Sequence, residues 1–309
     1  MGSDAHVIVV GGDEPGRVEP MLERALARIA DLESRWSRFV PSSEVSRLNS
    51  RRGVPTIVSA DTRLLIERAL LAADLTDGRF DPTMVDTIEA LGYDRDFAQV
   101  RADPPPRQPT RVRGLGTEGA AGIRVEPMLD AVTLPADVGF DPGGIGKGLA
   151  ADLVVNELME SGARGAMVNL GGDLRAEGIA PTPDGWVVGI EDPINASTNR
   201  ALVTIRRGGV CTSSRVRRRW TSSDGHDLHH VIDPKSGQPV EHSIATVTVV
   251  AGEAWWAEAL TKALFVEGVV DRARAERLLV NASALVIRTD GKVEQFGKAG
   301  VFTSIGTSH

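Results

Sequence analysis

The stretch DPGGIGKG, Asp141–Gly148, is the most informative in this chain, because it joins a glycine-rich loop to a run with the spacing of a helix. Its glycines at 143, 144, 146 and 148 let the backbone approach a neighbouring group closely. Apolar residues then recur at helical spacing, namely Ala150, Leu153, Val154 and Leu158. We therefore predict a loop that opens directly into a helix.

The start of this helix is a candidate site for an anion. Backbone N–H groups and the helix dipole favour negative charge there, and Lys147 adds a mobile positive charge. A glycine-rich turn followed by a solvated lysine accounts for the same residues equally well. The stretch is not a Walker A loop, which needs glycine in place of Asp141 and serine or threonine in place of Gly148. It also fails to match the dinucleotide-binding GxGxxG in the required order after a strand.

Composition limits the class of protein. The chain has 309 residues, of which 41% are hydrophobic, enough to bury a substantial core. A formal net charge of -7 gives no electrostatic reason to expect nucleic acid, and no apolar run approaches the length of a membrane span. Cys211 is the only cysteine, which excludes an intrachain disulfide and a cysteine-rich metal site. The first residues, MGSDAHVIVV, contain no signal-peptide pattern and no lipid-attachment cysteine. We expect a cytoplasmic protein, with a trimmed exported form as the alternative.

Strand and helix patterns are interleaved along the chain. A short apolar strand is predicted over 7–10, and apolar spacings predict helices over 22–36 and 64–75. Residues 101–122 are rich in proline, glycine and charge, which predicts a surface excursion. Further strands are predicted over 166–170, 186–190, 201–205, 246–250 and 285–288. The predicted fold class is α+β (mixed α/β), and in the absence of a repeat or a boundary we predict one composite domain over residues 1–309.

Six segments, taken together and in order, resemble the FAD:protein FMN transferase family, also called the ApbE family. They are SRFVPSSEVSRLN (37–49), DGRFDPT (77–83), DPGGIGKGLAAD (141–152), VNLGGD (168–173), TSS (212–214) and HHVIDPKSGQP (229–239). Each segment is weak alone, but six in the right order are hard to obtain by chance. The resemblance spans nearly the whole chain and implies the family's single composite flavin transferase fold.

The resemblance implies a transferase that binds FAD and, with a divalent ion such as Mg²⁺, attaches the FMN moiety to a serine or threonine of an acceptor flavoprotein. The bond formed is a phosphoester, and AMP is released. This chemistry needs neutralised phosphate charge, an oriented hydroxyl and a base for its proton. The chain carries no Gly-Ala-Ser/Thr segment of its own, so we expect the acceptor to be a separate protein.

The catalytic candidates are His230 and Lys147. Lys147 and the glycine loop supply positive charge and N–H groups to the phosphates. Histidine has an ordinary pKa of about 6.5 and can accept a proton near neutral pH. The resemblance assigns the motif histidine to the second position of the pair, His230. His229 lies on the opposite face if the segment is extended.

The resemblance also places a larger set of residues around the FAD, and several have an alternative structural role. Asp233 is suited to a turn, the pair Gly171 and Gly172 to a tight bend, and SSEV at 42–45 to a helix N-cap. DG at 77–78 marks a turn, and DPT at 81–83 is able to start a helix. The complete cofactor-binding set is Ser37, Phe39, Glu44, Asp77, Phe80, Asp81, Asp141, Gly143, Gly144, Lys147, Asn169, Gly171, Gly172, Asp173, Thr212, Ser213, His230 and Asp233.

The metal site departs from the family pattern, which is an aspartate with a threonine four residues later on one helical face. Here Glu258 and Lys262 hold these positions. A glutamate oxygen can bind a divalent ion, whereas a protonated lysine cannot. The two residues also have the favourable i, i+4 order of a helix ion pair, worth about 0.2 to 0.5 kcal/mol. Three outcomes are open: the ammonium of Lys262 replaces the ion, the ion binds Glu258 and a carbonyl near Gly144, or catalysis is lost.

A second departure is RVRRRW at 215–220, where the family more often has a tyrosine and one arginine. If the segment is extended, Arg215, Arg217 and Arg219 share one face and Arg218 lies on the other. A solvated strand face is the simpler interpretation, and contact with a phosphate or an acidic acceptor is the functional one.

Three functions therefore remain open. FMN transfer is the main hypothesis. A catalytically weak or inactive FAD-binding protein is the second, because one lysine is a poorer substitute for a divalent ion in phosphoryl chemistry. An FAD pyrophosphatase, in which water replaces the acceptor hydroxyl and FMN and AMP are released, is the third. None of the three needs a nucleic-acid partner or a membrane span.

Overall fold

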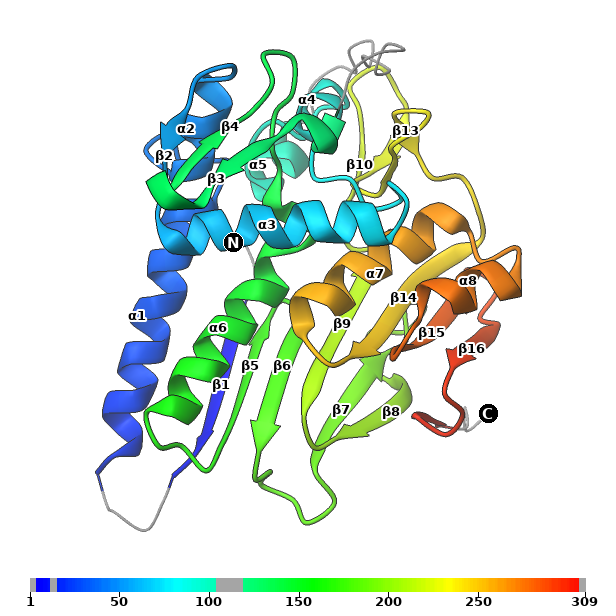
Figure 1. Cartoon of the computed structure of the whole chain (residues 1–309). Coiled ribbons are helices and arrows are strands. Elements are labelled where there is room, and N and C mark those ends of the chain that lie inside the picture. Colours follow the sequence, from blue (N-terminus) through cyan, green and yellow to red (C-terminus); the bar gives the residue numbers. More distant parts are fainter. Residues whose placement is uncertain (1–3, 12–15, 104–118, 306–309) are drawn as a thin grey trace. The chain divides into compact units, whose positions relative to one another are not determined.

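The computed structural model describes residues 4–11, 16–103 and 119–305 (Figure 1). The predicted surface excursion near 101–122 falls largely outside these described residues. The chain divides into two compact units, which are described separately. The first consists of Met1–Gly2, Asp31–Gly146 and Arg215–Glu241, and the second of Ser3–Ala30, Lys147–Ser214 and His242–His309. The single composite domain over residues 1–309 stays a prediction.

The second unit is built on a seven-stranded sheet. All neighbouring strands are antiparallel. In sheet order the strands are β1 (Ala5–Val10), β5 (Gly165–Leu170), β6 (Asp173–Gly178), β9 (Gly208–Ser214), β14 (Ile244–Ala251), β15 (Ser283–Arg288) and β16 (Val293–Gly297). Every strand predicted from the sequence in this unit is present. Helices combine with an antiparallel sheet, which confirms the α+β (mixed α/β) class.

Helices cover one face of this sheet, as Figure 1 shows for α6 (Gly146–Glu160) and α7 (Ala254–Glu267). Because side chains alternate along a strand, residues of β9 at odd positions face α7. The thiol of Cys211 contacts the carbonyl oxygen of Ala254 at 3.3 Å, and burial raises the pKa of this thiol. A shorter helix, α8 (Arg272–Leu278), follows α7. The helix predicted after the glycine loop is confirmed as α6.

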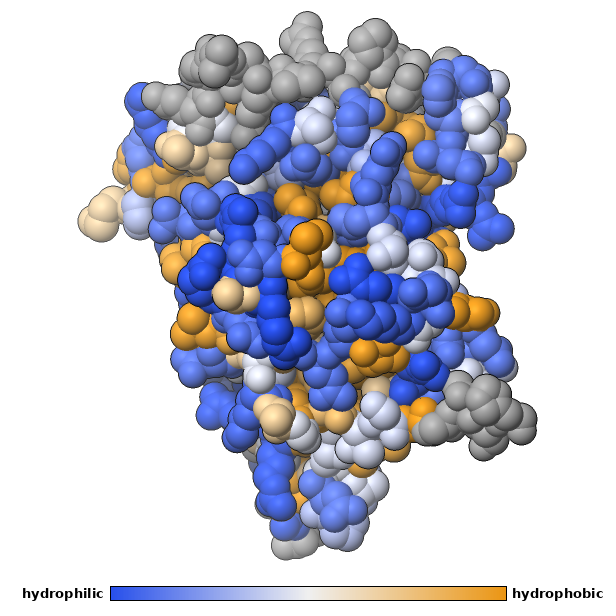
Figure 2. Space-filling model, turned by 90° about the vertical axis from the view of Figure 1, so that its right-hand side faces the viewer, coloured by the Kyte–Doolittle hydropathy of each residue, from blue (hydrophilic) through white to orange (hydrophobic). Residues whose placement is uncertain are grey.

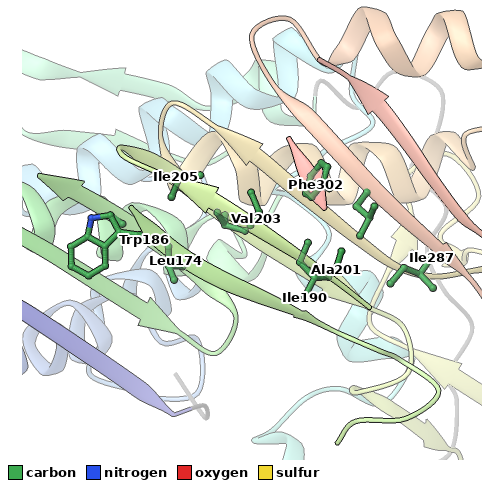
Figure 3. Packing of buried hydrophobic residues seen from close by; sticks show 11 residues of the cluster. Leu174, Trp186, Ile190, Ala201, Val203, Ile205, Ile287 and Phe302 are labelled. Atoms are coloured by element: carbon green, nitrogen blue, oxygen red, sulfur yellow. The ribbon is translucent and has the colours of Figure 1, made fainter. Parts of the chain in front are cut away.

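The other face of the sheet packs against a three-stranded sheet, whose order is β17 (Phe302–Ser304), β8 (Asn199–Ile205) and β7 (Trp186–Glu191). Between the two sheets lies an apolar core, shown in Figure 3. Leu174 of β6 and Ile287 of β15 contribute from the large sheet, and Val203 of β8 from the small one. The remaining labelled members are Trp186, Ile190, Ala201, Ile205 and Phe302. This core makes the central strands a rigid support for side chains on the helical face.

Gly148 is required by the close packing of α6 against α7. A Cβ atom at this position would lie 2.4 Å from the carbonyl oxygen of Ala254, a backbone atom that cannot move aside. We expect Gly148→Ala to lower the free energy of unfolding by about 1–3 kcal/mol, the range typical of overpacking. Gly252→Ala is the matched control, because nothing lies within 4 Å of a Cβ atom there. Denaturant unfolding measures both variants, and equal midpoints would contradict the close approach.

The first unit is mainly helical. Its regular elements are the end of α1 (Val18–Trp36), then α2 (Glu44–Ser50), α3 (Ala60–Leu75), α4 (Val85–Ala90), α5 (Phe97–Ala102) and the short 3-10 helices η1 (Gly119–Gly122), η2 (Pro127–Leu129) and η3 (Pro142–Gly144). Three short strands form a small sheet in the order β2 (Thr56–Ile57), β4 (Ala131–Thr133) and β3 (Arg124–Glu126). Two hairpins follow, β10 (Arg219–Thr221) with β11 (Asp227–His229), and β12 (Ile232–Asp233) with β13 (Gln238–Pro239). The predicted helices over 22–36 and 64–75 are confirmed as α1 and α3.

An aromatic core joins the β10–β11 hairpin to α4 and α5. The ring of Tyr93 lies 5.8 Å from the rings of both Phe97 and Trp220, measured between centroids. The indole nitrogen of Trp220 donates to the carbonyl oxygen of Leu91 at 3.2 Å. Ile88, Val100, Leu228 and Ile232 complete this buried cluster. The hairpins that carry the histidine motif are therefore anchored on the helical part of their own unit.

The expectation of an extended RVRRRW segment is wrong in part. Residues 215–218 form a turn after β9, and β10 begins only at Arg219. Arg215, Arg217 and Arg218 therefore do not alternate between two strand faces. Arg219 pairs at the surface with Asp227 on the neighbouring strand at 2.5 Å. Strand β11 ends at His229, which is the partner of Arg219, so pairing within this hairpin extends no further back than Arg219.

Figure 2 shows one face of the molecule, on which hydrophilic side chains dominate and hydrophobic ones form small scattered groups. Scattered apolar residues are normal on a protein surface. Within the described ranges of the chain, no helix combines the length and the apolar character that crossing a membrane requires.

Candidate functional site

The candidate residues fall on both units, and each unit brings its own motif segments together. In the first unit, the backbone N–H of Asp141 donates to the carbonyl oxygen of Pro82 at 2.7 Å, which joins the glycine loop to DGRFDPT. The side chain of Asn49 bonds both backbone groups of Phe140, at 2.9 Å and 2.7 Å. Three of the six segments therefore meet, although they are far apart in the sequence.

Arg38 is a residue that sequence reasoning missed. Its guanidinium donates to the carbonyl oxygen of Tyr93 at 2.6 Å and lies 3.6 Å from a carboxylate oxygen of Asp141. It also stacks over the rings of Phe39 and Tyr93, 4.2 Å and 4.9 Å from their centroids. Burial raises the pKa of the Tyr93 hydroxyl, while Arg218 and Arg38 act in the opposite direction. The available signal was the position of Arg38 inside the SRFVPSSEVSRLN segment.

The two adjacent histidines have different surroundings. Strand β11 ends at His229, whose Nε2 lies 3.2 Å from the carbonyl oxygen of Val240. His230 follows in a bend, and its Nδ1 lies 3.4 Å from the carbonyl oxygen of Arg218. Both rings are half-buried. The segment is thus not extended through His230, and the two rings contact different carbonyl groups.

Several candidates in the first unit hold local turns. Asp233 accepts from the backbone N–H of Lys235 and the hydroxyl of Ser236, both at 3.0 Å, which confirms the predicted turn. Asp81 accepts from the backbone N–H of Thr83 at 2.8 Å. Asp77 has a φ of 54° and a side chain that is 90% exposed. These carboxylates shape their own loops, as the sequence pattern predicted.

The remaining candidates of the first unit also have structural contacts within that unit. Ser43, next to Glu44, caps α2 by accepting from the backbone N–H of Ser46, which confirms the N-cap. Glu44 itself accepts from the hydroxyl of Ser59 at 2.8 Å. Phe80 is 3% exposed and belongs to the core. Ser37 accepts from the N–H of Phe39 near the end of α1, Gly143 donates to the Asp141 side chain, and Gly144 ends η3.

In the second unit, VNLGGD forms the tight turn between β5 and β6. Gly171 and Gly172 have φ values of 65° and 97°, which favour glycine. The side chain of Asn169 accepts from the backbone N–H of Gly172 at 2.8 Å, and the Gly172 carbonyl accepts from the N–H of Thr212 at 3.1 Å. The turn places Asp173 at the start of β6, with its side chain on the helical face of the sheet.

A buried charge cluster lies on that face, formed by Lys147, Asp173, Glu258 and Lys262. The ammonium of Lys147 pairs with Asp173 and lies 3.2 Å from Oε1 of Glu258. Lys262 lies 3.2 Å from the same oxygen, and the backbone N–H of Gly148 donates to Oε2 at 2.7 Å. Burial alone would raise the pKa of Glu258, but Lys147, Lys262 and the Gly148 N–H outweigh it and hold that pKa below its ordinary value. Glu258 is therefore ionised.

This cluster occupies the anion site that was predicted at the N-terminus of α6. The anion that accepts from the N–H of Gly148 is the chain's own Glu258 carboxylate. The Lys147 side chain is only 15% exposed, so its charge is held in place and not mobile. The predicted ion pair of Glu258 and Lys262 is present. Sequence reasoning missed the partnership of Lys147 with Glu258, because 111 residues separate them.

Thr212 and Ser213 point to opposite faces of β9. The hydroxyl of Ser213 contacts that of Thr261 on α7 at 2.6 Å, and Thr261 also donates to the Glu258 carbonyl oxygen at 2.6 Å. The hydroxyl of Thr212 contacts that of Thr248 on β14 at 2.9 Å. Only Ser213 therefore shares the helical face with the charge cluster.

Asp152 is a second missed residue, although it ends the DPGGIGKGLAAD segment. Its carboxylate accepts from the backbone N–H groups of Ala254 and Trp255 at 2.9 Å and 2.8 Å, which caps the first turn of α7. Arg175 of β6 lies 3.6 Å from the same carboxylate and also donates to the carbonyl oxygen of Gly252. Asp152 thus fixes the start of the helix that carries Glu258.

The capping carboxylate of Asp152 makes stability depend on pH. Burial raises its pKa to about 7, although the N–H groups of Ala254 and Trp255 lower it. Because the folded-state pKa lies above the ordinary 3.8, this contribution to stability is full below that value and is lost as pH rises through about 7.

We expect Asp152→Asn to remove this component of the pH dependence, since an amide does not titrate. The free energy of unfolding of wild type, relative to the variant, should fall between about pH 5 and about pH 8. Urea unfolding of wild type and Asp152→Asn at both pH values gives the difference in their free energies of unfolding at each pH. A relative stability that stays constant would show that Asp152 titrates outside this window.

Comparison with known proteins identifies the family of this chain. The sequence pattern of the ApbE family matches residues 1–285. This chain belongs to the ApbE family. A protein of Haemophilus influenzae is 28% identical over 301 residues, covering 94% of this chain and 85% of the relative. A protein of Treponema pallidum is 29% identical over 304 residues, covering 95% and 84%. Both are called FAD:protein FMN transferase.

Solved structures agree with the fold of this ApbE family member. The crystal structure of the ApbE protein from Thermotoga maritima aligns with a TM-score of 0.81 and 25% identity, covering 96% of this chain and 94% of that one. The apo form of the flavinyl transferase ApbE from Pseudomonas stutzeri aligns with a TM-score of 0.76 and 26% identity, covering 96% and 92%. The similarity therefore includes both units of the chain.

Proposed function

We propose that this chain is an FAD:protein FMN transferase, which moves the FMN moiety of FAD to a serine or threonine hydroxyl of an acceptor protein and releases AMP. The observation that carries the proposal is that relatives with this name align along 94% and 95% of the chain. The similarity also extends over 85% and 84% of the two relatives.

The proposed reaction breaks the phosphoanhydride bond of FAD and forms a phosphoester bond. The acceptor hydroxyl oxygen bonds to the phosphorus on the riboflavin side of the FAD diphosphate, and the bond from that phosphorus to the bridging oxygen breaks. AMP leaves with that oxygen, and the hydroxyl proton passes to a base. Catalysis of such a step consists mainly of positioning and charge stabilisation.

His230 is the base in this proposal. A proton on Nδ1 that is donated to the Arg218 carbonyl selects the tautomer in which Nε2 carries the lone pair. The bend at His230 and the anchoring of its hairpin by Trp220 hold the ring in place. This geometry supports a role in orienting and deprotonating the acceptor hydroxyl.

Lys147 supplies positive charge to the phosphates in this proposal. Its ammonium is held by two carboxylates, so it is oriented before a ligand arrives. The other candidate residues, many of which shape turns, are predicted by the resemblance to lie around the flavin. They are Asp77, Asp81, Asp141, Gly143, Gly144, Asn169, Gly171, Gly172, Asp173 and Asp233, with Ser37, Phe39, Glu44, Phe80, Thr212 and Ser213 beside them.

The divalent ion that the family resemblance implies does not fit the residues at 258 and 262. Both oxygens of Glu258 already accept from nitrogen donors, and two of these donors are ammonium groups. Asp173 has a buried Oδ1 without a hydrogen-bond partner in the described part of the chain, but one oxygen is too few for a divalent ion. Over the same residues no group of three acidic, histidine or cysteine side chains is suited to a metal. The proposed reaction therefore includes no step through an ion, and a site shared with Gly144 stays a prediction.

The test of the proposed function is incubation of the purified protein with FAD and a Thr-bearing acceptor flavoprotein. AMP is followed by chromatography and the acceptor by mass spectrometry. We expect AMP together with an FMN adduct on the acceptor. AMP and FMN without an acceptor would instead establish the pyrophosphatase alternative. FAD binding without any AMP would establish the inactive binding protein.

A further inference from the structure

Lys262 completes the buried charge cluster of the second unit. We propose that its ammonium is the permanent cation of this cluster, in place of a divalent ion on Glu258, and that the chain holds FAD without such an ion. The part that concerns FAD rests on the proposed function. The exclusion of the ion rests on the cluster alone.

The geometry leaves Glu258 no capacity for a metal. Its side chain is 0% exposed, and Oε1 lies 3.2 Å from the nitrogens of both Lys147 and Lys262. The other oxygen accepts from the N–H of Gly148 at 2.7 Å. A Mg²⁺ ion demands oxygen ligands at about 2.0–2.1 Å in octahedral geometry. It would have to displace both ammonium groups, which repel it.

The balance of charge leads to the same conclusion. The ammonium groups of Lys147 and Lys262 balance the carboxylates of Asp173 and Glu258, so the cluster carries no formal net charge. Without Lys262, one negative charge would stay uncompensated at a buried position, which is costly. That charge would recruit a cation from solution. Lys262 removes the need for one.

The fold, and not the solvent, supplies this cation. Lys262 stands one helical turn after Glu258 on α7, so the helix fixes the distance between the two groups. Its side chain is 18% exposed, which keeps the ammonium at the border of the cluster. Thr261, the adjacent residue, ties α7 to Ser213 of β9. The position of α7 therefore holds the backbone of Lys262 at a fixed place beside Glu258.

The first experiment measures metal binding directly, in the absence of FAD and acceptor. Mn²⁺ is titrated into the folded protein, and the free ion is followed by its electron paramagnetic resonance signal. We expect no stoichiometric Mn²⁺ binding by wild type and one Mn²⁺ site in Lys262→Thr. The apparent Mn²⁺ affinity of this variant should be at least about 10-fold higher than that of wild type. Lys262→Gln is a second variant in case the threonine variant fails to fold.

Two further variants assign the site. Lys292→Thr is the matched control, because Lys292 also pairs with a glutamate, at 3.3 Å, but is 63% exposed at the surface. It should bind no more Mn²⁺ than wild type. In a Lys262→Thr chain, an added Glu258→Gln should abolish the new site. Wild-type binding as tight as that of Lys262→Thr would overturn the proposal.

The second experiment measures FAD binding by difference absorbance, in EDTA and in Mg²⁺. We expect the wild-type affinity to agree within about twofold in the two conditions, and the affinity of Lys262→Gln in EDTA to be about 10-fold weaker. A wild-type protein that binds FAD only with Mg²⁺ would overturn the proposal. A complete lack of FAD binding would overturn the proposed function instead, and the Mn²⁺ titration would still decide the question of the cation.

Discussion

Replacement of His230 by alanine is expected to lower the rate of FMN transfer by about 10²–10⁴-fold, the size typical of losing a general base. FAD binding should weaken far less than the rate, because His230 is one of many residues in the predicted FAD-binding set and is not proposed to carry the charge that holds the diphosphate. AMP release in a single turnover measures the rate. Difference absorbance measures FAD binding in the same samples.

His229→Ala is the matched control for this prediction. Its ring also lies within hydrogen-bonding distance of a carbonyl, that of Val240 at 3.2 Å, so the two substitutions remove similar local contacts. The control should retain most of the transfer rate. Equal losses in the two variants would mean that the hairpin, and not a base at His230, limits the reaction.

Replacement of Glu258 by alanine should lower the free energy of unfolding by about 3–5 kcal/mol, the cost of leaving a buried charge without its partner. Lys262 loses its carboxylate, and Lys147 keeps only that of Asp173. The N–H of Gly148 loses its acceptor as well. Urea unfolding of wild type and variant at neutral pH measures the difference.

Glu276→Ala is the control, because Glu276 pairs with Arg272 at 2.9 Å on an exposed face. Exposed pairs contribute about 0–1 kcal/mol. The pH dependence is a further check. The pKa of Glu258 lies below its ordinary 4.5, so its contribution is present above that value and is lost as pH falls through the lower, folded-state pKa. A difference between wild type and Glu258→Ala that grows in acid would contradict the ionised carboxylate.

Local patterns were sufficient for much of the fold. The helix after the glycine loop, the strands β5, β7, β8, β14 and β15, and the caps and turns at Ser43, Asp233 and the Gly171–Gly172 pair follow from residues close in sequence. Apolar spacing and side-chain bonds to nearby backbone act over a few residues. The exception is 215–218, where a turn precedes β10 although the pattern predicted an extended segment.

The site is different, because its contacts join residues far apart. The i, i+4 pair of Glu258 and Lys262 can be deduced from spacing alone, and the motif order is sufficient to place the chain in its family. No local pattern predicts that Lys147 meets Glu258, that Asp152 caps α7, or that Arg38 stacks on Tyr93.

Residue order along the chain was thus enough for many of the elements and for the family, while the roles of the candidate residues stay predictions. Folding of the sheet and packing of α6 on α7 decided which charges meet, and only that packing shows that Glu258 is buried between two ammonium groups. The physical reason is that the energy of a buried charge depends on its neighbours in space and on the exclusion of water. The spacing of residues in the sequence specifies neither the spatial neighbours of a charge nor its exposure to water.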